Sequence, residues 1–417
     1  MKNILISSYG VCPDVNEHPG SEFSISWNFV NKLARTKKYN ITLLVGSSDG
    51  ELRGLNNLKN VKIDNVNIVY VKTNIYVNSI FRFFYHKLGI KFIWPIYLRF
   101  WNQAAFKVAS KLHKENKFDI VHQYNPGGFK NPGYLWKLGV KSIWGPVFGL
   151  HFFNLRLAYA QSFSYFLKCI IWNSANYLFR FDLYVINGAK KYNKIWFGTN
   201  DTGKYFKKFF NVIGSQVSEQ SISNTENINE YIKGKSNETL KIIWIGRVEY
   251  RKNLKLFLDI CKSIKNPAKK IEVYILGKGP LLHKYKKYWE KDKSDVNLSF
   301  LNHMPRNKLL KLMEECHVVS FTSMAEGNTS VIFEAMEKGL IPIALDSHGF
   351  SSSISYNMGI KINIMNPYKN IVQNYRNEIL NISKTEVLGK YQSNLINYAH
   401  LNSWEETIKK HISVYEE

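Results

Sequence analysis

Two glutamates, Glu326 and Glu334, stand eight positions apart in the stretch CHVVSFTSMAEGNTSVIFEAMEKGLIPIALDSHG. Carboxylates accept hydrogen bonds from sugar hydroxyls, and the exposed N–H groups at a helix start bind phosphate. The pattern would suit a ligand that carries both hydroxyl and phosphate groups. The spacing alone favours an ordinary strand–helix unit with two solvated acids, so the rest of the chain must decide between the two.

The elements around these acids predict how they are held. A short apolar run at residues 318–321 predicts a strand, and a helix is expected at 329–338. Gly339 follows as a helix-ending residue, and residues 341–345 predict the next buried strand. A loop between such a strand and helix lies at the carboxyl edge of a parallel sheet, where ligands bind.

Two cations and a glycine could complete a phosphate site. Arg247 and Lys252 come directly after a predicted strand at residues 241–245. Two such cations with a helix start can hold a diphosphate without a metal ion. The chain has no Asp-x-Asp pair and no GxxxxGK[ST] motif, so we expect no metal site. Gly20, just before a predicted helix at 22–35, would let a phosphate approach the backbone.

The chain length favours two domains, and the cysteine pattern and the short apolar runs favour a protein inside the cell. A chain of 417 residues is long for one core. The four cysteines are scattered without a CxxC pair, which is typical of a reducing compartment. The first apolar run is too short for a signal peptide, and no apolar run approaches the ~20 residues that span a bilayer. We expect a cytoplasmic protein.

The charge is concentrated in the first half. The chain holds 57 Lys and Arg against 32 Asp and Glu, a net charge of +25. Residues 1–215 hold 29 of these bases and 10 of these acids. No acid occurs between Asp64 and Glu115, or between Asp119 and Asp182. This excess indicates an anionic partner: nucleic acid, a membrane surface or a phosphorylated substrate.

Two aromatic segments lie within the acid-free stretches. In residues 80–112, Trp94, Tyr97 and Trp101 recur at helical spacing among basic residues. Such a helix can lie in a membrane interface or pack on a sheet with its basic side chains in water, and both alternatives stay open. Residues 152–181 form the second segment, another candidate membrane or acceptor surface.

The remaining pattern alternates strands with helices in both halves, which predicts an α/β fold of two Rossmann-like, doubly wound domains. Further strands are predicted at residues 3–7, 41–45, 67–71, 118–123, 141–144, 183–186, 195–197, 272–276 and 296–301. Further helices are predicted at residues 254–264, 306–315 and 402–415, and a polar linker at 214–238. His122 and His151 fall near strand ends, where a single histidine is more often structural than catalytic.

These motifs resemble glycosyltransferase family 4, the retaining GT-B transferases that use nucleotide sugars. The resemblance is carried by Glu326-Gly327 through Glu334-Ala335-Met336, WIGRVEYRKN at 244–253, LGKGP at 276–280 and GLIP at 339–342. In the first half, HPGSEFSISWN, NPGYLWKLGVKSIWGPV and His122 are similar to a bacterial subgroup that builds capsule, O-antigen or exopolysaccharide repeats.

The resemblance implies a role for each matching residue. Arg247, Lys252 and Glu326 would be the catalytic group, with the two cations on the departing diphosphate. Glu334 would bind the ribose. The other sugar-donor contacts would be Gly20, His303, Met304, Gly327, Asn328 and Thr329, and His122 would lie on the acceptor or sugar side. Asn328 and Thr329 stand where the family often has Phe-Gly or Phe-Pro, which could alter the preference for the donor sugar.

The resemblance also implies a GT-B architecture with an interdomain cleft. The chain would comprise an acceptor domain at 1–214, a linker at 215–238, a nucleotide-sugar domain at 239–395 and a helix at 396–417 that returns to the first domain. The implied activity is hexosyl transfer from a UDP- or GDP-linked sugar, without another cofactor, to an oligosaccharide or polyprenyl-diphosphate-linked glycan. The protein would contact the anionic inner membrane peripherally and would not bind nucleic acid. The alternatives are a nucleotide-sugar epimerase or hydrolase, and a non-catalytic basic protein that binds membranes or nucleic acid.

Overall fold

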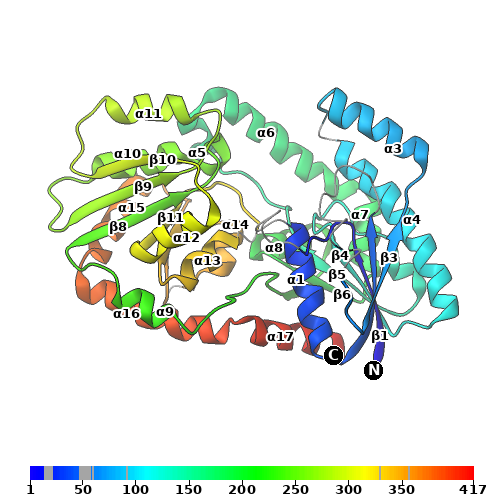
Figure 1. The fold of residues 1–417 in the computed structure, drawn as a ribbon. Helices are drawn as coiled ribbons and strands as arrows, with labels where there is room; N and C mark the ends of the chain where they lie inside the picture. Colours follow the sequence, from blue (N-terminus) through cyan, green and yellow to red (C-terminus); the bar gives the residue numbers. More distant parts are fainter. Residues whose placement is uncertain (14–21, 47–57, 59–60, 91–92, 328–329, 356) are drawn as a thin grey trace. The chain divides into compact units, whose positions relative to one another are not determined.

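The computed structural model describes residues 1–13, 22–46, 58, 61–90, 93–327, 330–355 and 357–417. The chain forms two compact units. Unit 1 comprises residues 1–150, 176–219 and 408–417, and unit 2 comprises residues 151–175 and 220–407. Each unit holds a parallel sheet between helices (Figure 1). This arrangement confirms the predicted fold class of two Rossmann-like domains.

The sheet of unit 1 has seven strands among the described residues, in the order β3-β2-β1-β4-β5-β6-β7. All neighbouring pairs are parallel, and Ile4 of the central β1 lies opposite Ile41 and Ile120. The apolar residues of β1 are fully buried, as expected for a strand covered on both faces. The bounds are β1 Lys2–Ser8, β2 Tyr39–Gly46, β3 Val66–Val71, β4 Ile120–Asn125, β5 Lys141–Val147, β6 Lys194–Phe197 and β7 Ser215–Gln216.

Helix α4 (Trp94–Glu115) packs on this sheet through the residues that recur at helical spacing. Tyr97 and Trp101 are buried in the core of unit 1, whereas Ile96 and Phe100 on the same helix are about half exposed. The other helical elements of unit 1 are α1 Glu22–Arg35, α3 Ile75–Arg82, the π-helical turn η1 Phe83–Lys87, the 3₁₀ turns η3 Leu135–Leu138 and η4 Phe179–Phe181, α7 Leu183–Lys191 and α8 Asn200–Phe210.

The strand predicted at 183–186 is wrong, because these residues begin helix α7. The Asp182 side chain accepts a hydrogen bond from the Tyr184 N–H at 2.9 Å and so caps the first turn. A short apolar run does not by itself distinguish a strand from a buried helix. The cap is the signal that the sequence interpretation overlooked.

The last residues of the chain pack in unit 1. Helix α17 (Trp404–Glu416) continues from unit 2 into unit 1, to which residues 408–417 belong. The rings of His411 and Trp196 lie 4.9 Å apart, and the Tyr415 hydroxyl lies 2.6 Å from Nδ1 of His122. These buried contacts hold the terminal helix against β4 and β6.

The sheet of unit 2 has six described strands in the order β10-β9-β8-β11-β12-β13, again all parallel. Val318 of β11 lies opposite Ile242 and Ile341, which places the loops after β8, β11 and β12 at one edge. The bounds are β8 Thr239–Ile245, β9 Lys270–Leu276, β10 Asn297–Asn302, β11 Val318–Phe321, β12 Ile341–Leu345 and β13 Ile360–Ile362.

The helices of unit 2 cover both faces of its sheet (Figure 1). Helices α10, α11, α15 and α5 gather on one face, and α9, α12, α13 and α16 gather on the other. The bounds are α5 Leu155–Gln161, α6 Phe163–Leu178, α9 Ile228–Lys233, the 3₁₀ turn η5 Tyr250–Lys252, α10 Leu254–Ser263, α11 Leu282–Glu290, α12 Arg306–Glu315, α13 Ser330–Glu337, α14 His348–Ser353, α15 Tyr368–Ile382 and α16 Thr385–Leu401.

One segment is grouped differently from the expected domain boundaries. Residues 151–175 were expected within a domain spanning 1–214, but they pack in unit 2. Leu157, Ala158 and Cys169 join the hydrophobic core of that unit, and the Asn154 amide donates to the carbonyl of Ile364 at 2.8 Å. The expected linker also contains structure, namely β7 and α9.

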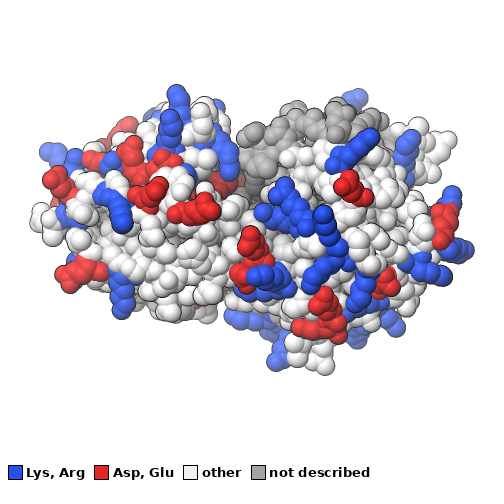
Figure 2. Space-filling model, turned by 60° about the horizontal axis from the view of Figure 1, so that its bottom comes forward, with Lys and Arg blue, Asp and Glu red and all other residues white. Residues whose placement is uncertain are grey.

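The charged side chains do not collect in one patch on the face shown in Figure 2. Basic side chains there are interspersed with acidic ones and with uncharged surface on each unit. Within the described residues, no helix is both long enough and apolar enough to cross a membrane.

Candidate functional site

Glu326 is the centre of a cluster of charged side chains in unit 2. Its Oε1 lies 2.6 Å from Nζ of Lys252 and 2.7 Å from Nη1 of Arg251. The carboxylate side chain is only 10% exposed. Arg251 also donates to the carbonyl oxygen of Ala325 at 2.8 Å. The structure thus joins the loop after β8 to the loop after β11 through a half-buried ion-pair network.

Local backbone geometry turns Lys252 toward Glu326. Asn253 follows the turn η5 and has a positive φ of 52°. Its side chain accepts from the Leu256 N–H and so caps α10. Asparagine tolerates this left-handed conformation better than most residues. The backbone N–H of Met324 donates to the Arg251 carbonyl at 2.8 Å, and the Thr322 hydroxyl lies 3.1 Å from the Lys252 carbonyl. The two loops therefore also hold each other through backbone contacts.

Arg247 lies at the exposed rim of the cluster. Its side chain is 71% exposed, and its Nε lies 3.5 Å from Oε2 of Glu249. The other oxygen of Glu249 lies 3.2 Å from Arg251, so this acid links the rim to the buried pairs. An exposed guanidinium in a long ion pair can turn toward an incoming anion at little cost.

Glu334 belongs to a second ion pair. It lies on α13, and its Oε1 accepts from Nη1 of Arg306 at 2.8 Å, with 13% of the Glu334 side chain exposed. Arg306 is the first residue of α12 and follows His303 and Met304. His303 is exposed and Met304 is half-buried. The expected nucleotide-base loop is therefore tied to the expected ribose-binding glutamate through Arg306.

Glycines allow the loops after β11 and β12 to touch. The Gly349 N–H donates to the Glu326 carbonyl at 3.1 Å. A Cβ at Gly349 would lie 1.7 Å from the carbonyl oxygen of Gly327. No side chain larger than hydrogen fits there without moving the loop that holds Glu326.

Three expected site residues lie outside the described residues: Gly20, Asn328 and Thr329. The described part of the site includes three residues that the sequence interpretation did not single out: Arg251, Arg306 and Gly349. Arg251 stands beside Lys252 in the WIGRVEYRKN run, so its charge and position were available as a signal. Arg306 and Gly349 are brought to the site only when the chain folds, and no spacing in the sequence indicates that they belong to it.

The charges of this cluster suit an anion. Four cations, Arg247, Arg251, Lys252 and Arg306, face three carboxylates through the ion pairs described above. Guanidinium and ammonium groups are the side chains that bind phosphate most strongly. No three His, Cys, Asp or Glu side chains of the described residues gather in a way that could hold a metal ion.

His122 lies away from any open surface, in the core of unit 1. Its side chain is fully buried, Nδ1 lies 2.6 Å from the Tyr415 hydroxyl and Nε2 lies 2.7 Å from the Gly145 carbonyl. Burial lowers the pKa of this imidazole to about 3, against a smaller raising effect of the Gly145 carbonyl. Both ring nitrogens are thus engaged within the core of unit 1.

The buried His122 predicts a loss of stability in acid. The unfolded imidazole has a pKa of about 6.5, so the unfolded state binds more protons than the folded state between about pH 6.5 and pH 3. The free energy of unfolding should therefore fall as the pH drops through this window. Urea unfolding at pH 7, 5.5 and 4.5 should show that the free energy of unfolding falls more steeply for the natural protein than for His122→Gln. If the free energy of unfolding fell equally in the two proteins, His122 would not be a buried neutral imidazole in the folded state.

Comparisons with known proteins agree with this fold. Residues 226–399 match the family model Glycosyl transferases group 1. A stretch of 108 residues, 25% of this chain, is 30% identical to the amylovoran biosynthesis glycosyltransferase AmsD of Erwinia amylovora, and the match spans 29% of that protein's length. This matching family domain contains every described residue of the ion-pair cluster.

Solved structures extend the likeness over both units. The apo lipopolysaccharide outer core galactosyltransferase WaaB has a TM-score of 0.61 at 12% identity, over 98% of this chain and 97% of that one. Anabaena HepE in complex with UDP has a TM-score of 0.56 at 12% identity, over 100% and 99% of the two chains. The chain thus has the GT-B fold, and its residues 226–399 match the Glycosyl transferases group 1 model.

Proposed function

We propose that the protein is a retaining, metal-independent glycosyltransferase. It takes a hexose-type sugar from a nucleoside diphosphate sugar, UDP- or GDP-linked, and adds it to an oligosaccharide or polyprenyl-diphosphate-linked glycan in the synthesis of a cell-surface polysaccharide such as capsule or O-antigen. The observation that carries this proposal is the Glu326 carboxylate held by Lys252 and Arg251 within a group 1 domain. The UDP bound to HepE, of the same fold, supports the nucleotide part.

The proposed reaction assigns one step to each group. The bond between the anomeric carbon and the diphosphate oxygen breaks, and Arg247 and Lys252 stabilise the negative charge of the departing nucleotide. An acceptor hydroxyl attacks the anomeric carbon from the same face, and its proton passes to the departing phosphate oxygen. Because two cations neutralise the leaving group, this step needs no metal ion. Glu326 then holds the sugar hydroxyls and keeps Lys252 in place.

The remaining residues would bind the rest of the sugar donor. Glu334, oriented by Arg306, would accept from the ribose hydroxyls, and the loop containing His303 and Met304 would contact the base. The backbone of Gly327, Asn328 and Thr329 would hold the distal phosphate, and Gly20 would approach the diphosphate. We also propose that the protein is cytoplasmic and associates peripherally with the inner membrane surface.

Nucleotide release from a panel of UDP- and GDP-sugars tests the proposal. We expect Arg247→Ala and Glu326→Ala each to lower release by about tenfold or more. Arg247→Ala removes a cation from the diphosphate, and Glu326→Ala removes the carboxylate that holds the sugar and Lys252. The matched control is Lys270→Ala, since Lys270 is also exposed and also pairs with an acid two residues away, Glu272, at 2.7 Å. We expect this control to keep the natural rate.

Three results would contradict the proposal. Unchanged release in both site variants would remove the assigned site. Release that does not depend on any acceptor would indicate an epimerase or hydrolase. Binding to RNA or anionic vesicles without any binding of nucleotide would indicate a non-catalytic protein. NMR of the anomeric configuration of the product separates retention from inversion.

A further inference from the structure

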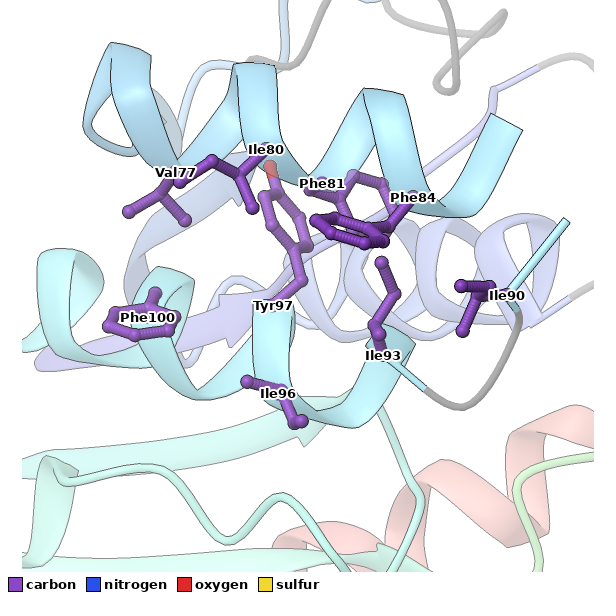
Figure 3. Close-up of a pocket in the computed structure, with 9 residues that line it drawn as sticks. All are labelled: Val77, Ile80, Phe81, Phe84, Ile90, Ile93, Ile96, Tyr97 and Phe100. Carbon is purple, nitrogen blue, oxygen red and sulfur yellow. The ribbon is translucent and has the colours of Figure 1, made fainter. Parts of the chain in front are cut away.

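An apolar groove lies on unit 1 between α3 with η1 on one side and α4 on the other. Its volume is about 510 Å³, within the usual range for sites that bind small molecules. Figure 3 shows side chains of α3 and η1 facing those of α4 across the groove. The lining residues are Val77, Ile80, Phe81, Phe84, Ile90, Ile93, Ile96, Tyr97 and Phe100.

The groove has a packed floor and exposed walls. The rings of Phe81 and Tyr97 stack at 4.2 Å and are almost fully buried. Ile80 and Ile96 at the walls are 59% and 51% exposed. Large apolar side chains left in water around a preformed hollow indicate a site for an apolar ligand.

The position of the groove in unit 1 suits a substrate. Helix α3 begins four residues after β3 ends, so the groove starts at the carboxyl edge of the sheet. The ring of Tyr9, which follows β1, lies 5.5 Å from that of Trp94 and 5.1 Å from that of Trp101 on α4. The groove helices therefore pack beside the switch point between β1 and β4, where open parallel sheets bind ligands.

The charges around the groove favour an anionic head group. Lys72 beside α3 and Lys87 on η1 are exposed. The sequence holds no acid between Asp64 and Glu115. Arg99 on α4 does not add to this charge, because it is paired with Asp182. An apolar hollow beside these exposed lysines is complementary to a hydrocarbon chain that carries phosphate.

We propose that this groove binds the hydrocarbon chain of a lipid-linked acceptor, an isoprenoid-type chain attached to a phosphate or diphosphate. The proposal rests on the function proposed above and assigns the acceptor's lipid to named residues. A chain lying in the groove buries the exposed walls against the packed floor, which a flat membrane surface would not do. The basic residues beside α3 contact the phosphate group.

Farnesyl diphosphate is a soluble probe of this site, and Ile80→Asp and Ile75→Asp form a matched pair. Both isoleucines lie on α3 and are exposed, but only Ile80 lines the groove. Calorimetry with the full chain should show at least roughly tenfold weaker binding of farnesyl diphosphate to Ile80→Asp, because burying a carboxylate against a hydrocarbon chain is unfavourable. Ile75→Asp, which makes the same change of charge, should bind within about twofold of the natural protein, since it leaves the groove intact. Phe100→Asp repeats the test from α4, and circular dichroism verifies that each variant is folded.

Other probes separate the alternatives. Inorganic diphosphate should bind more weakly than farnesyl diphosphate and should not distinguish Ile80→Asp from Ile75→Asp. Equal binding of farnesyl diphosphate to these two variants, or no saturable binding to the natural protein, would overturn the proposal. Equal losses of binding to phosphatidylglycerol vesicles in both variants, without an effect on farnesyl diphosphate, would instead indicate a general membrane contact.

Failure of the groove to bind lipid can be distinguished from failure of the proposed transferase function. Release of nucleotide from the sugar donor does not involve the groove, so Ile80→Asp should keep the rate measured with a lipid-free acceptor. It should lose activity only with a lipid-linked acceptor. If no sugar donor were turned over at all, groove binding of farnesyl diphosphate could still stand while the transferase assignment failed.

Discussion

Replacing Lys252 with methionine is expected to slow turnover of the sugar donor by about 10²-fold, because it removes one of the two cations that we propose act on the departing diphosphate. The variant should also be less stable by about 1–3 kcal/mol. Glu326 would then remain almost buried with Arg251 as its nearest described cation. Nucleotide release and urea unfolding of the same preparations measure the two effects separately.

Lys241→Met is the matched control for this prediction. Lys241 makes an ion pair of 2.9 Å with Glu315 in the same unit, but that glutamate is mostly exposed. Exposed pairs contribute little to stability, so the control should change both quantities only slightly. Turnover by Lys252→Met at the natural rate would show that the lysine only holds Glu326 and does not act on the leaving group.

Replacing Gly349 with alanine is expected to reduce activity by about 10²-fold without removing any charged group. The added Cβ would lie 1.7 Å from the Gly327 carbonyl oxygen, so the loop that carries Glu326 must shift. A displacement of about 1 Å at a catalytic group is enough for such a loss. We expect a cost in stability of about 1–3 kcal/mol from the overpacked contact.

Gly389→Ala provides the comparison for this glycine. Gly389 lies within α16 of the same unit, and outside the local backbone of that helix no heavy atom lies within 4 Å of the position of its added Cβ. Alanine there should stabilise the helix by about 0.5–1 kcal/mol and leave turnover unchanged. A crystal structure of Gly349→Ala with Glu326 and Lys252 still 2.6 Å apart, or natural activity, would contradict the predicted shift.

The central elements of both sheets could be predicted because their signals are local. The strand expected at 318–321 and the helix expected at 306–315 have the predicted bounds, since a continuous apolar run and a 3–4 residue spacing each identify one element. Gly339 has the expected positive φ after α13. The strand expected at 183–186 failed because the capping role of Asp182 depends on the first turn that it starts.

The site was predicted less completely because its contacts are not local. The sequence indicates that Arg247, Arg251 and Lys252 share one loop, but not which of them reaches Glu326. The turn η5 and the positive φ at Asn253 decide that, and they place Arg251 and Lys252 against the carboxylate. The pairing of Arg306 with Glu334 joins two different helices, so no spacing within either helix could reveal it.

The grouping of residues 151–175 with unit 2 affects how this protein could be divided or recombined. Neither unit is encoded by one continuous stretch, because the chain passes between them after residues 150, 175, 219 and 407. A gene fragment that starts at residue 220 would lack Leu157, Ala158 and Cys169, which fill part of the core of that unit. A chimera meant to exchange unit 2 between two proteins of this fold must therefore transplant both segments together.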